Sequence, residues 1–189
     1  MQLFEKEHIF KMQKDKIMIL YNSKTGFTQT YAELLAAKLD CAALPLKDAP
    51  ADLSQYDVVA FGSRLHAGML DGWKKARKLL AQRSAKKLVL FATGAMPNEA
   101  EAQIQKVWEQ NLTPEEQKTI PHFYLQAGLC YEKMGGVDRA MMKFAAWAMT
   151  RKKSKTEEDE AFRNAIRQSY DISDPKYIEP VVTCLKQEN

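Results

Sequence analysis

The sequence predicts an α/β protein built on a parallel β-sheet that helices cover on both faces. Short apolar runs alternate with longer helical patterns through to residue 128, which is the order expected of right-handed βαβ units. Three of the apolar runs end in small or polar residues, as strands do where their carboxyl ends meet a ligand. The 189 residues, of which 46% are hydrophobic and 28% charged, are enough for one domain with its own core.

The strands of the sheet are expected where the apolar runs stand, at 16–21, 41–46, 57–63, 87–93 and 123–128. The runs at 16–21, 57–63 and 87–93 are typical of parallel strands that are buried on both faces. The second run includes a proline, which has no N–H to donate inside a sheet, so this strand is expected at an edge.

Helical patterns fill the spaces between these strands, at about 28–39, 71–83 and 98–110, and return at 177–186. A short further helix is expected from Thr113, because a threonine cap, a proline and an acidic first turn follow one another there. The helix at 177–186 is expected to pack on the sheet through the apolar residues on one of its sides, which are Ile178, Val181, Val182 and Leu185.

Two segments fall outside this alternation. Residues 1–15 are expected to be an N-terminal extension of a domain that covers 16–189. Residues 129–176 are expected to be a helical insertion between the last strand and the last helix. Within it, 156–169 has the threonine cap, acidic start and basic later turns of a surface helix. An insertion at this point could cover a ligand or form an interface.

The helix expected at 137–150, which Asp138 can cap, is apolar on nearly all sides. Only Arg139 and Lys143 interrupt its apolar surface before a basic end at 151–155. A helix of this kind is buried or binds something apolar. Three interpretations follow: a helix packed inside the domain, a homodimer contact, or a peripheral contact with a membrane surface.

Composition and charge limit the function classes. The formal net charge of +4 suits an anionic substrate or a membrane surface, and no nucleic-acid partner is expected. Cys41, Cys130 and Cys184 have neither metal-ligand nor disulfide-framework spacing, so no metal site is expected. No apolar run approaches the ~20 residues of a membrane-spanning helix, and no signal peptide is recognised. The expected location is cytoplasmic, with peripheral contact to the inner face of the membrane as the alternative.

The first strand runs into a loop whose residues suit a phosphate. Ser23, Thr25, Thr28 and Thr30 offer hydroxyl groups, and Gly26 lets the backbone bend without a Cβ clash. The start of the next helix adds free N–H groups and the positive end of the helix dipole. The loop has the spacing of neither the Walker A motif nor the dinucleotide fingerprint. The alternative is an ordinary strand-to-helix turn with a threonine cap.

This loop, Ser23-Lys24-Thr25-Gly26-Phe27-Thr28, resembles the S/T-x-T-G-x-T loop with which the flavodoxin family binds the phosphate of FMN. The resemblance extends over about 16–150 and implies a flavodoxin-like, doubly wound five-stranded parallel sheet of order 2-1-3-4-5. It implies FMN as the cofactor, held by these six residues and by two loops that flank the flavin ring. Those loops are Ser63, Arg64, Leu65, His66, Ala67 and Gly68 after the third strand, and Thr93, Gly94, Ala95 and Met96 after the fourth.

One of the ring loops departs from the usual family form. Where flavodoxins have Gly-Ser-Pro-x-Tyr, this chain has Arg64 and His66 in place of the proline and the aromatic. The loop 62–68 is instead similar to that of the flavodoxin-like, menaquinone-dependent protoporphyrinogen dehydrogenases. So is the segment Ala127-Gly128-Leu129-Cys130-Tyr131 with the aromatic and basic residues 138–144 that follow it. That resemblance implies an FMN-dependent oxidoreductase that passes electrons from an organic donor to a quinone-like acceptor.

Arg64 and His66 are the candidate catalytic residues of such an enzyme. Arg64 could stabilise a reduced flavin or meet an anionic substrate, and His66 could be a hydrogen-bonding loop residue or a proton relay. Two other hypotheses stand beside this one. The chain could be an electron-transfer module with a redox partner and no small substrate, or a flavodoxin fold without flavin that serves as an interaction domain.

Overall fold

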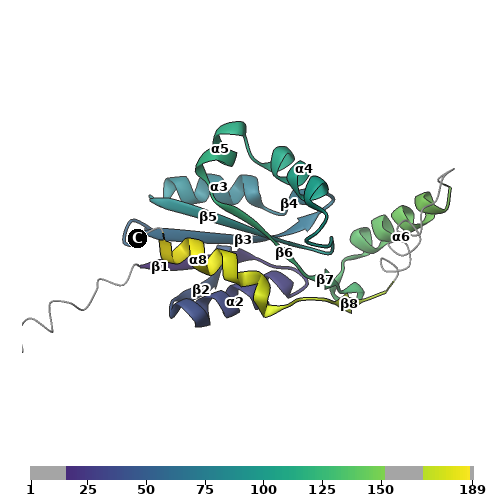
Figure 1. The fold of residues 1–189 in the computed structure, drawn as a ribbon, viewed down its shortest axis with the longest axis horizontal. Helices are drawn as coiled ribbons and strands as arrows, with labels where there is room; N and C mark the ends of the chain where they lie inside the picture. Colours follow the sequence, from purple (N-terminus) through teal and green to yellow (C-terminus); the bar gives the residue numbers. More distant parts are fainter. Residues whose placement is uncertain (1–15, 152–167, 188–189) are drawn as a thin grey trace, which may run out of the picture.

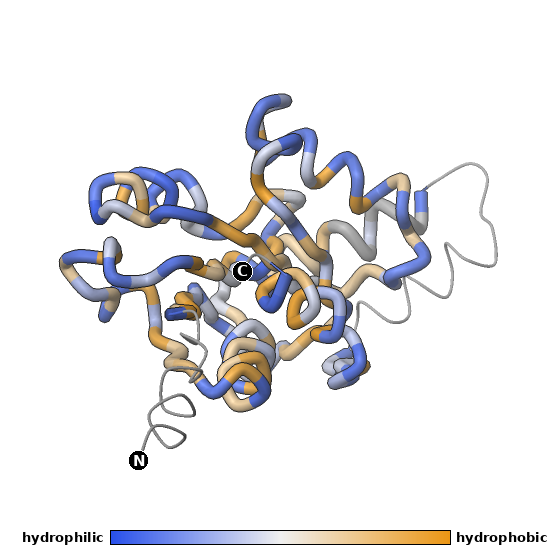
Figure 2. Tube along the Cα trace, turned by 60° about the vertical axis from the view of Figure 1, so that its left-hand side comes forward, coloured by the Kyte–Doolittle hydropathy of each residue, from blue (hydrophilic) through white to orange (hydrophobic). Residues whose placement is uncertain are grey.

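A computed structural model describes residues 16–151 and 168–187 of the protein. The extension expected at 1–15 and most of the helix expected at 156–169 lie outside these residues. The described residues form a central sheet between two layers of helices, with one further helix that extends away from the sheet (Figure 1). Hydrophobic stretches gather in the middle of the molecule, whereas the outer loops are hydrophilic (Figure 2).

Five parallel strands form the central sheet in the order β2-β1-β3-β5-β6. Counted along the chain this is the order 2-1-3-4-5, which confirms the predicted topology. The strand that contains the proline lies at an edge, as expected. The strands are β1 (Ile17–Asn22), β2 (Ala42–Pro45), β3 (Val58–His66), β5 (Lys87–Gly94) and β6 (His122–Gln126).

Helices cover both faces of this sheet (Figure 1). The face with α2 and α8 is opposite the face with α3, α4 and α5. The bounds of these helices are α2 (Phe27–Leu39), α3 (Trp73–Gln82), α4 (Glu101–Asn111), α5 (Pro114–Thr119) and α8 (Glu179–Gln187), with short 3-10 helices at η1 (Leu46–Asp48) and η3 (Pro175–Ile178).

The strands divide their side chains between two apolar cores, one on each face. On β1, Ile19 packs with the α2 and α8 side, whereas its neighbours Met18 and Leu20 pack with the α3 and α4 side. The apolar side predicted for the last helix is buried in the first of these cores, through Ile178, Val181, Val182 and Leu185. A sheet covered on both faces leaves the carboxyl ends of its strands as the place for a ligand.

The third parallel strand does not end where the sequence predicted. β3 continues past residue 63 to His66 and folds back as an antiparallel hairpin with β4 (Met69–Leu70). The turn residues Ala67 and Gly68 have φ angles of 50° and 79°, which is the pair of positive φ values that a tight hairpin turn requires. The segment predicted as a ring-flanking loop is therefore a short hairpin at the edge of the site.

The chain between β6 and α8 leaves the sheet and returns to it. Where this segment leaves and rejoins the sheet, β7 (Gly128–Leu129) pairs antiparallel with β8 (Tyr170–Asp171). A Cβ at Gly128 would lie 2.0 Å from the carbonyl oxygen of Tyr170, so only glycine allows this approach. After β7 come the 3-10 helix η2 (Tyr131–Lys133) and α6 (Gly136–Thr150), the helix that extends away from the sheet (Figure 1). Residues 130–138 are called the strap below.

Candidate functional site

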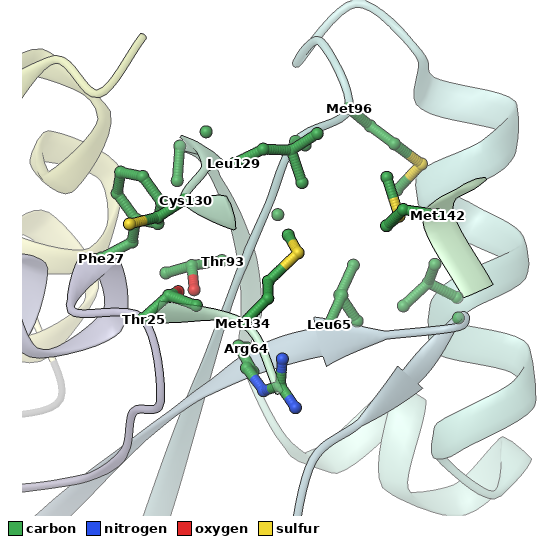
Figure 3. A pocket seen from close by; sticks show the side chains of 16 residues that line it. Thr25, Phe27, Arg64, Leu65, Thr93, Met96, Leu129, Cys130, Met134 and Met142 are labelled. Carbon is green, nitrogen blue, oxygen red and sulfur yellow. The ribbon is translucent and has the colours of Figure 1, made fainter. Parts of the chain in front are cut away.

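The candidate site lies at the carboxyl ends of β1, β3 and β5. The strand order reverses between β1 and β3, because the chain goes from β1 to β2 on one side and then to β3 on the other. In open α/β sheets such a switch point leaves a crevice between the loops that follow the two strands. The loops after β1 and β5 and the hairpin of β3 meet at this point, and the strap crosses beside them (Figure 3).

The loop after β1 presents an uncapped helix start. Gly26 is the N-cap of α2, with a φ of 105° and no side chain that caps the helix. The threonine cap considered as the alternative is therefore absent from this helix. The N–H of Gly26 donates to the hydroxyl of Ser23 at 3.2 Å, which shapes the loop. The first-turn N–H groups of α2 consequently have no side-chain acceptor and can meet an anion.

Two lysines lie beside this helix start. A Cβ placed on Gly26 would be 3.4 Å from Nζ of Lys133, and one placed on Gly135 would be 3.5 Å from Nζ of Lys24. Lys24 belongs to the predicted phosphate loop, but Lys133 comes from the strap and no motif pointed to it. Lys133 therefore adds positive charge at the N-terminal end of α2, where a phosphate is already favoured, whereas Nζ of Lys24 lies at the strap.

The hydroxyl groups of the loop have separate partners. The hydroxyls of Thr28 and Thr93 are 2.7 Å apart in a buried contact between α2 and β5. The hydroxyl of Thr30 donates to the carbonyl oxygen of Gly26 at 3.3 Å. Thr25 lines the cavity described below (Figure 3). Of the predicted hydroxyl donors, Thr25 is therefore the one that faces this cavity, whereas Thr28 fastens the helix to the sheet.

The hairpin of β3 is held in place by side-chain amides and hydroxyls. The hydroxyl of Ser63 donates to the carbonyl oxygen of Asp71 at 2.7 Å. Asn111, the last residue of α4, accepts from the N–H of Leu70 at 2.7 Å and donates to the carbonyl oxygen of Gly68 at 2.8 Å. Ser63 is buried and supports the hairpin from behind, so its hydroxyl is not presented to a ligand.

A single carboxylate joins the strap to two of the three predicted loops, the phosphate loop and the hairpin of β3. Oδ2 of Asp138 accepts from Nζ of Lys24 at 3.1 Å and from Nη1 of Arg64 at 3.4 Å. Nε2 of His66 lies 3.1 Å from its Oδ1, in a direction that makes no hydrogen bond. The hydrogen bond from Lys24 and the charge of Arg64 hold the pKa of Asp138 below its ordinary value. Arg64 also donates from Nε to Asp71 at 2.9 Å, so both of its partners are acidic side chains of the chain itself.

The loop after β5 is fixed by a tyrosine. The hydroxyl of Tyr124 accepts from the N–H of Met96 at 2.8 Å and donates to its carbonyl oxygen at 2.9 Å. Burial raises the pKa of Tyr124, so the phenol stays protonated and can make both bonds. A Cβ at Gly94 would be 2.9 Å from this hydroxyl, so the absence of a side chain at Gly94 leaves room for Tyr124.

A cavity of about 240 Å³ lies between these loops and the strap (Figure 3). It is lined by predicted site residues from all three loops, which are Thr25, Phe27, Arg64, Leu65, Gly68, Thr93, Gly94, Ala95 and Met96. The rest of its lining comes from Val107 on α4, from residues 127–129, from Cys130 and Met134 of the strap, and from Met142 on α6. The side chain of Met134 projects into the middle of the space (Figure 3).

The other predicted site residues do not line this cavity. Ser23 lines a neighbouring hollow on the β2 side of the loop, and Gly26 and Thr28 form the helix start. Lys24 and His66 face Asp138, whereas Ser63 and Ala67 support and turn the hairpin. The strap residues were not among the predicted site residues, because the sequence of an insertion does not indicate which loops of the domain it will contact.

The described residues contain no group of three or more His, Cys, Asp or Glu that could hold a metal ion. In the same residues, no helix is both long and apolar enough to cross a membrane.

A family model for the flavodoxin domain matches residues 18–157 of the chain. Similar solved structures include a flavoprotein in complex with FMN from Lactobacillus acidophilus NCFM (15% identity, 59% of this chain and 92% of that chain, TM-score 0.41). Another is a flavodoxin from the domain Archaea (16% identity, 65% of this chain and 91% of that chain, TM-score 0.37). A third is a flavodoxin, WrbA-like protein from Agrobacterium tumefaciens (16% identity, 82% of this chain and 99% of that chain, TM-score 0.38). A comparison with curated proteins gave no match.

Proposed function

The chain belongs to the flavodoxin domain family, and from this premise we propose that it binds one FMN noncovalently at the carboxyl ends of β1, β3 and β5. The observation that carries the proposal is the start of α2. Its N-terminal N–H groups have no capping side chain, and Nζ of Lys133 lies beside it. FMN ends in one phosphate, and the sequence has no dinucleotide fingerprint that would favour FAD.

The apolar part of the cavity suits the flavin ring, but the strap must move to admit it. The cavity of about 240 Å³ is smaller than the roughly 300–1,000 Å³ of typical ligand pockets. Met134 occupies its middle, and an unbranched thioether side chain adapts readily to a new neighbour. We therefore propose that cofactor binding displaces Met134 and with it the strap.

Bound FMN would supply the redox chemistry, and the chain would supply binding and electrostatics. Thr25 and the start of α2 would hold the phosphate. Arg64 has its Nε fixed by Asp71 while its Nη1 faces Asp138 on the strap. Displacement of the strap would free Nη1 for an anionic group at the cavity wall, either of the reduced flavin or of a substrate, which are the two roles considered for this residue from the sequence.

We propose further that the protein is an oxidoreductase that passes electrons from a reduced organic donor to a quinone-like acceptor. The support is the likeness of the segments 62–68 and 127–131 to those of the menaquinone-dependent protoporphyrinogen dehydrogenases. With the flavin ring in the cavity, a planar apolar donor would bind beside that ring, where Arg64 could meet an anionic group of the donor. Donors of the tetrapyrrole class have this character.

Rapid mixing of the reduced protein with a quinone tests this proposal. Protein loaded with FMN is reduced anaerobically and mixed with menadione in a stopped-flow instrument. Reoxidation is expected to saturate with quinone concentration, because a pocket fills. Arg64→Ala is expected to raise the half-saturation concentration about tenfold, equivalent to one lost charge-assisted hydrogen bond. Arg77→Ala, which removes an exposed arginine paired with Glu116 on α5, is the matched control.

The outcomes separate the hypotheses. A second-order reaction without saturation, unchanged by Arg64→Ala at equal flavin content, would contradict a quinone pocket and favour an electron carrier that works with a redox partner. A purified protein that neither carries nor takes up flavin would contradict both and favour an interaction domain.

A further inference from the structure

Large apolar side chains lie exposed along one face of α6. The exposed fractions are 74% for Val137, 41% for Met141, 65% for Phe144 and 47% for Trp147. Their spacing of four, three and three residues places them on the same side of a helix with 3.6 residues per turn. The rings of Phe144 and Trp147 lie 5.4 Å apart, so the exposed face includes a contiguous aromatic surface. The name lipid face is used for these four residues.

The other side of α6 is turned toward the cavity. Asp138 in the first turn holds Lys24 and Arg64, and Met142 lines the cavity. The helix then extends away from the sheet (Figure 1). The helix is thus fixed by its first turn, and these exposures do not fit the interpretation of a helix packed inside the domain.

Positive charge accompanies the lipid face. Lys143 lies on α6, and the guanidinium carbon of Arg151 lies 4.2 Å from the centroid of the Trp147 ring. In the sequence, residues 139–155 contain six lysines and arginines and no aspartate or glutamate. Apolar side chains that end in a basic cluster are the composition of helices that lie in the interface of an anionic bilayer.

We propose that α6 docks the protein on an anionic lipid surface, with the lipid face against the acyl boundary and the basic residues among the headgroups. Tryptophan favours this interface because its ring is apolar and its N–H is polar. The proposal does not depend on flavin binding. It places the cavity, which Met142 lines from the other side of the same helix, about one helix diameter from the membrane surface.

A second copy of the chain suits this face less well. A stable interface buries about 800 Å² on each partner, contributed by about 20–30 residues, which is more than one stripe on a 15-residue helix supplies. A symmetric contact would also bring two copies of the same basic segment together. Anionic lipid headgroups instead neutralise that charge.

Vesicle binding of the full chain tests the proposal, with Trp147 as the reporter. The other two tryptophans, Trp73 and Trp108, are buried in the core, so a change in emission on binding reports on Trp147. Vesicles of 30% phosphatidylglycerol in phosphatidylcholine are compared with vesicles of phosphatidylcholine alone, by flotation and by emission. Anionic vesicles are expected to bind the protein and to shift the Trp147 emission to shorter wavelength.

Two pairs of variants separate apolar from electrostatic contributions. Val137→Ser with Phe144→Ser is expected to weaken partitioning at least about tenfold. Its control is Met69→Ser with Ile172→Ser, which removes exposed apolar side chains elsewhere. Lys143→Gln with Arg151→Gln is expected to weaken binding about tenfold, and Lys74→Gln with Lys78→Gln on α3 is its charge-matched control.

Three results would overturn the proposal. One is the absence of binding to anionic vesicles. A second is binding that both α6 variants leave unchanged, since the contact would then lie elsewhere. The third is a concentration-dependent dimer in light scattering that Val137→Ser with Phe144→Ser dissociates, with no vesicle binding, because the face would then belong to a second copy.

Discussion

Thr25 and Thr28 belong to one loop motif, but the fold gives them different tasks. Thr25 faces the cavity, whereas the hydroxyl of Thr28 meets Thr93 in a buried contact between helix and sheet. A hydroxyl on the cavity side can be exchanged between water and a phosphate. A buried hydroxyl that loses its partner has no water to replace it, so its removal affects folding first.

Substitution of these two threonines is therefore expected to separate binding from stability. Thr25→Ala should weaken FMN binding by about 1.5–3 kcal/mol, the range of a charge-assisted hydrogen bond, with little effect on unfolding. Thr28→Val should lower the free energy of unfolding by about 1–3 kcal/mol, because Thr93 is left unpaired. Flavin titration and urea unfolding measure the two effects, and Thr30→Ala is the control. Equal effects of Thr25→Ala and Thr30→Ala on affinity would contradict the assignment.

The proposed phosphate site could be predicted as a loop, but not residue by residue. The motif predicted a phosphate site at residues 23–28, since the spacing of hydroxyls and glycine is a property of the sequence. The direction of each hydroxyl depends on what the helix packs against. The hydroxyl of Thr28, for example, meets Thr93, which is 65 residues further along the chain. Arg64 illustrates the same limit, because its partners Asp71 and Asp138 come from two other elements.

The strap lines the cavity, and we propose that it controls access to it. Asp138 holds it against Lys24 and Arg64, two of the residues that are proposed to meet the cofactor. Its carboxylate would also repel an incoming phosphate. The carboxylate would therefore compete with the proposed cofactor for the same positive charge.

Neutralising Asp138 is expected to open the strap and to remove one source of acid sensitivity. Asp138→Asn should speed FMN association about tenfold at neutral pH in stopped-flow fluorescence. Because the folded-state pKa of Asp138 is lowered, its contribution to stability is present above about pH 5 and is lost as the pH falls below about 4. The difference in unfolding free energy between the wild type and Asp138→Asn should shrink over that range.

The control for the association rate is Asp174→Asn, which alters an acidic residue that accepts from the backbone N–H of Lys176 in η3. An unfolding difference for Asp138→Asn that stays constant from pH 7 to pH 3, or an association rate equal to that of the wild type, would show that the carboxylate does not hold the strap closed.

At the scale of the whole molecule, the fold could be predicted because its signals are local. Buried parallel strands are apolar runs, and helix starts carry caps and glycines, so the alternation is visible along the chain. The strand order and the packing of the last helix followed from that pattern and the family resemblance.

The far wall of the cavity could not be predicted in this way. It is made by the strap, which meets Lys24 across 114 residues of sequence. The hairpin at Ala67 and Gly68 was not predicted for a related reason. The side chain that holds it, Asn111, lies on α4 and is 43 residues further along the chain than Gly68. Contacts of this range are decided by packing and not by a periodic pattern.

The central claim is that the start of α2 binds the phosphate of FMN, and a comparison of flavins tests it most directly. The flavin-free protein is titrated with FMN, riboflavin and FAD by flavin fluorescence at constant ionic strength. FMN is expected to bind at least about a hundredfold more tightly than riboflavin, equivalent to about two charge-assisted hydrogen bonds, with FAD weaker than FMN. Equal affinity for FMN and riboflavin would contradict the claim and leave residues 23–28 as a turn between strand and helix.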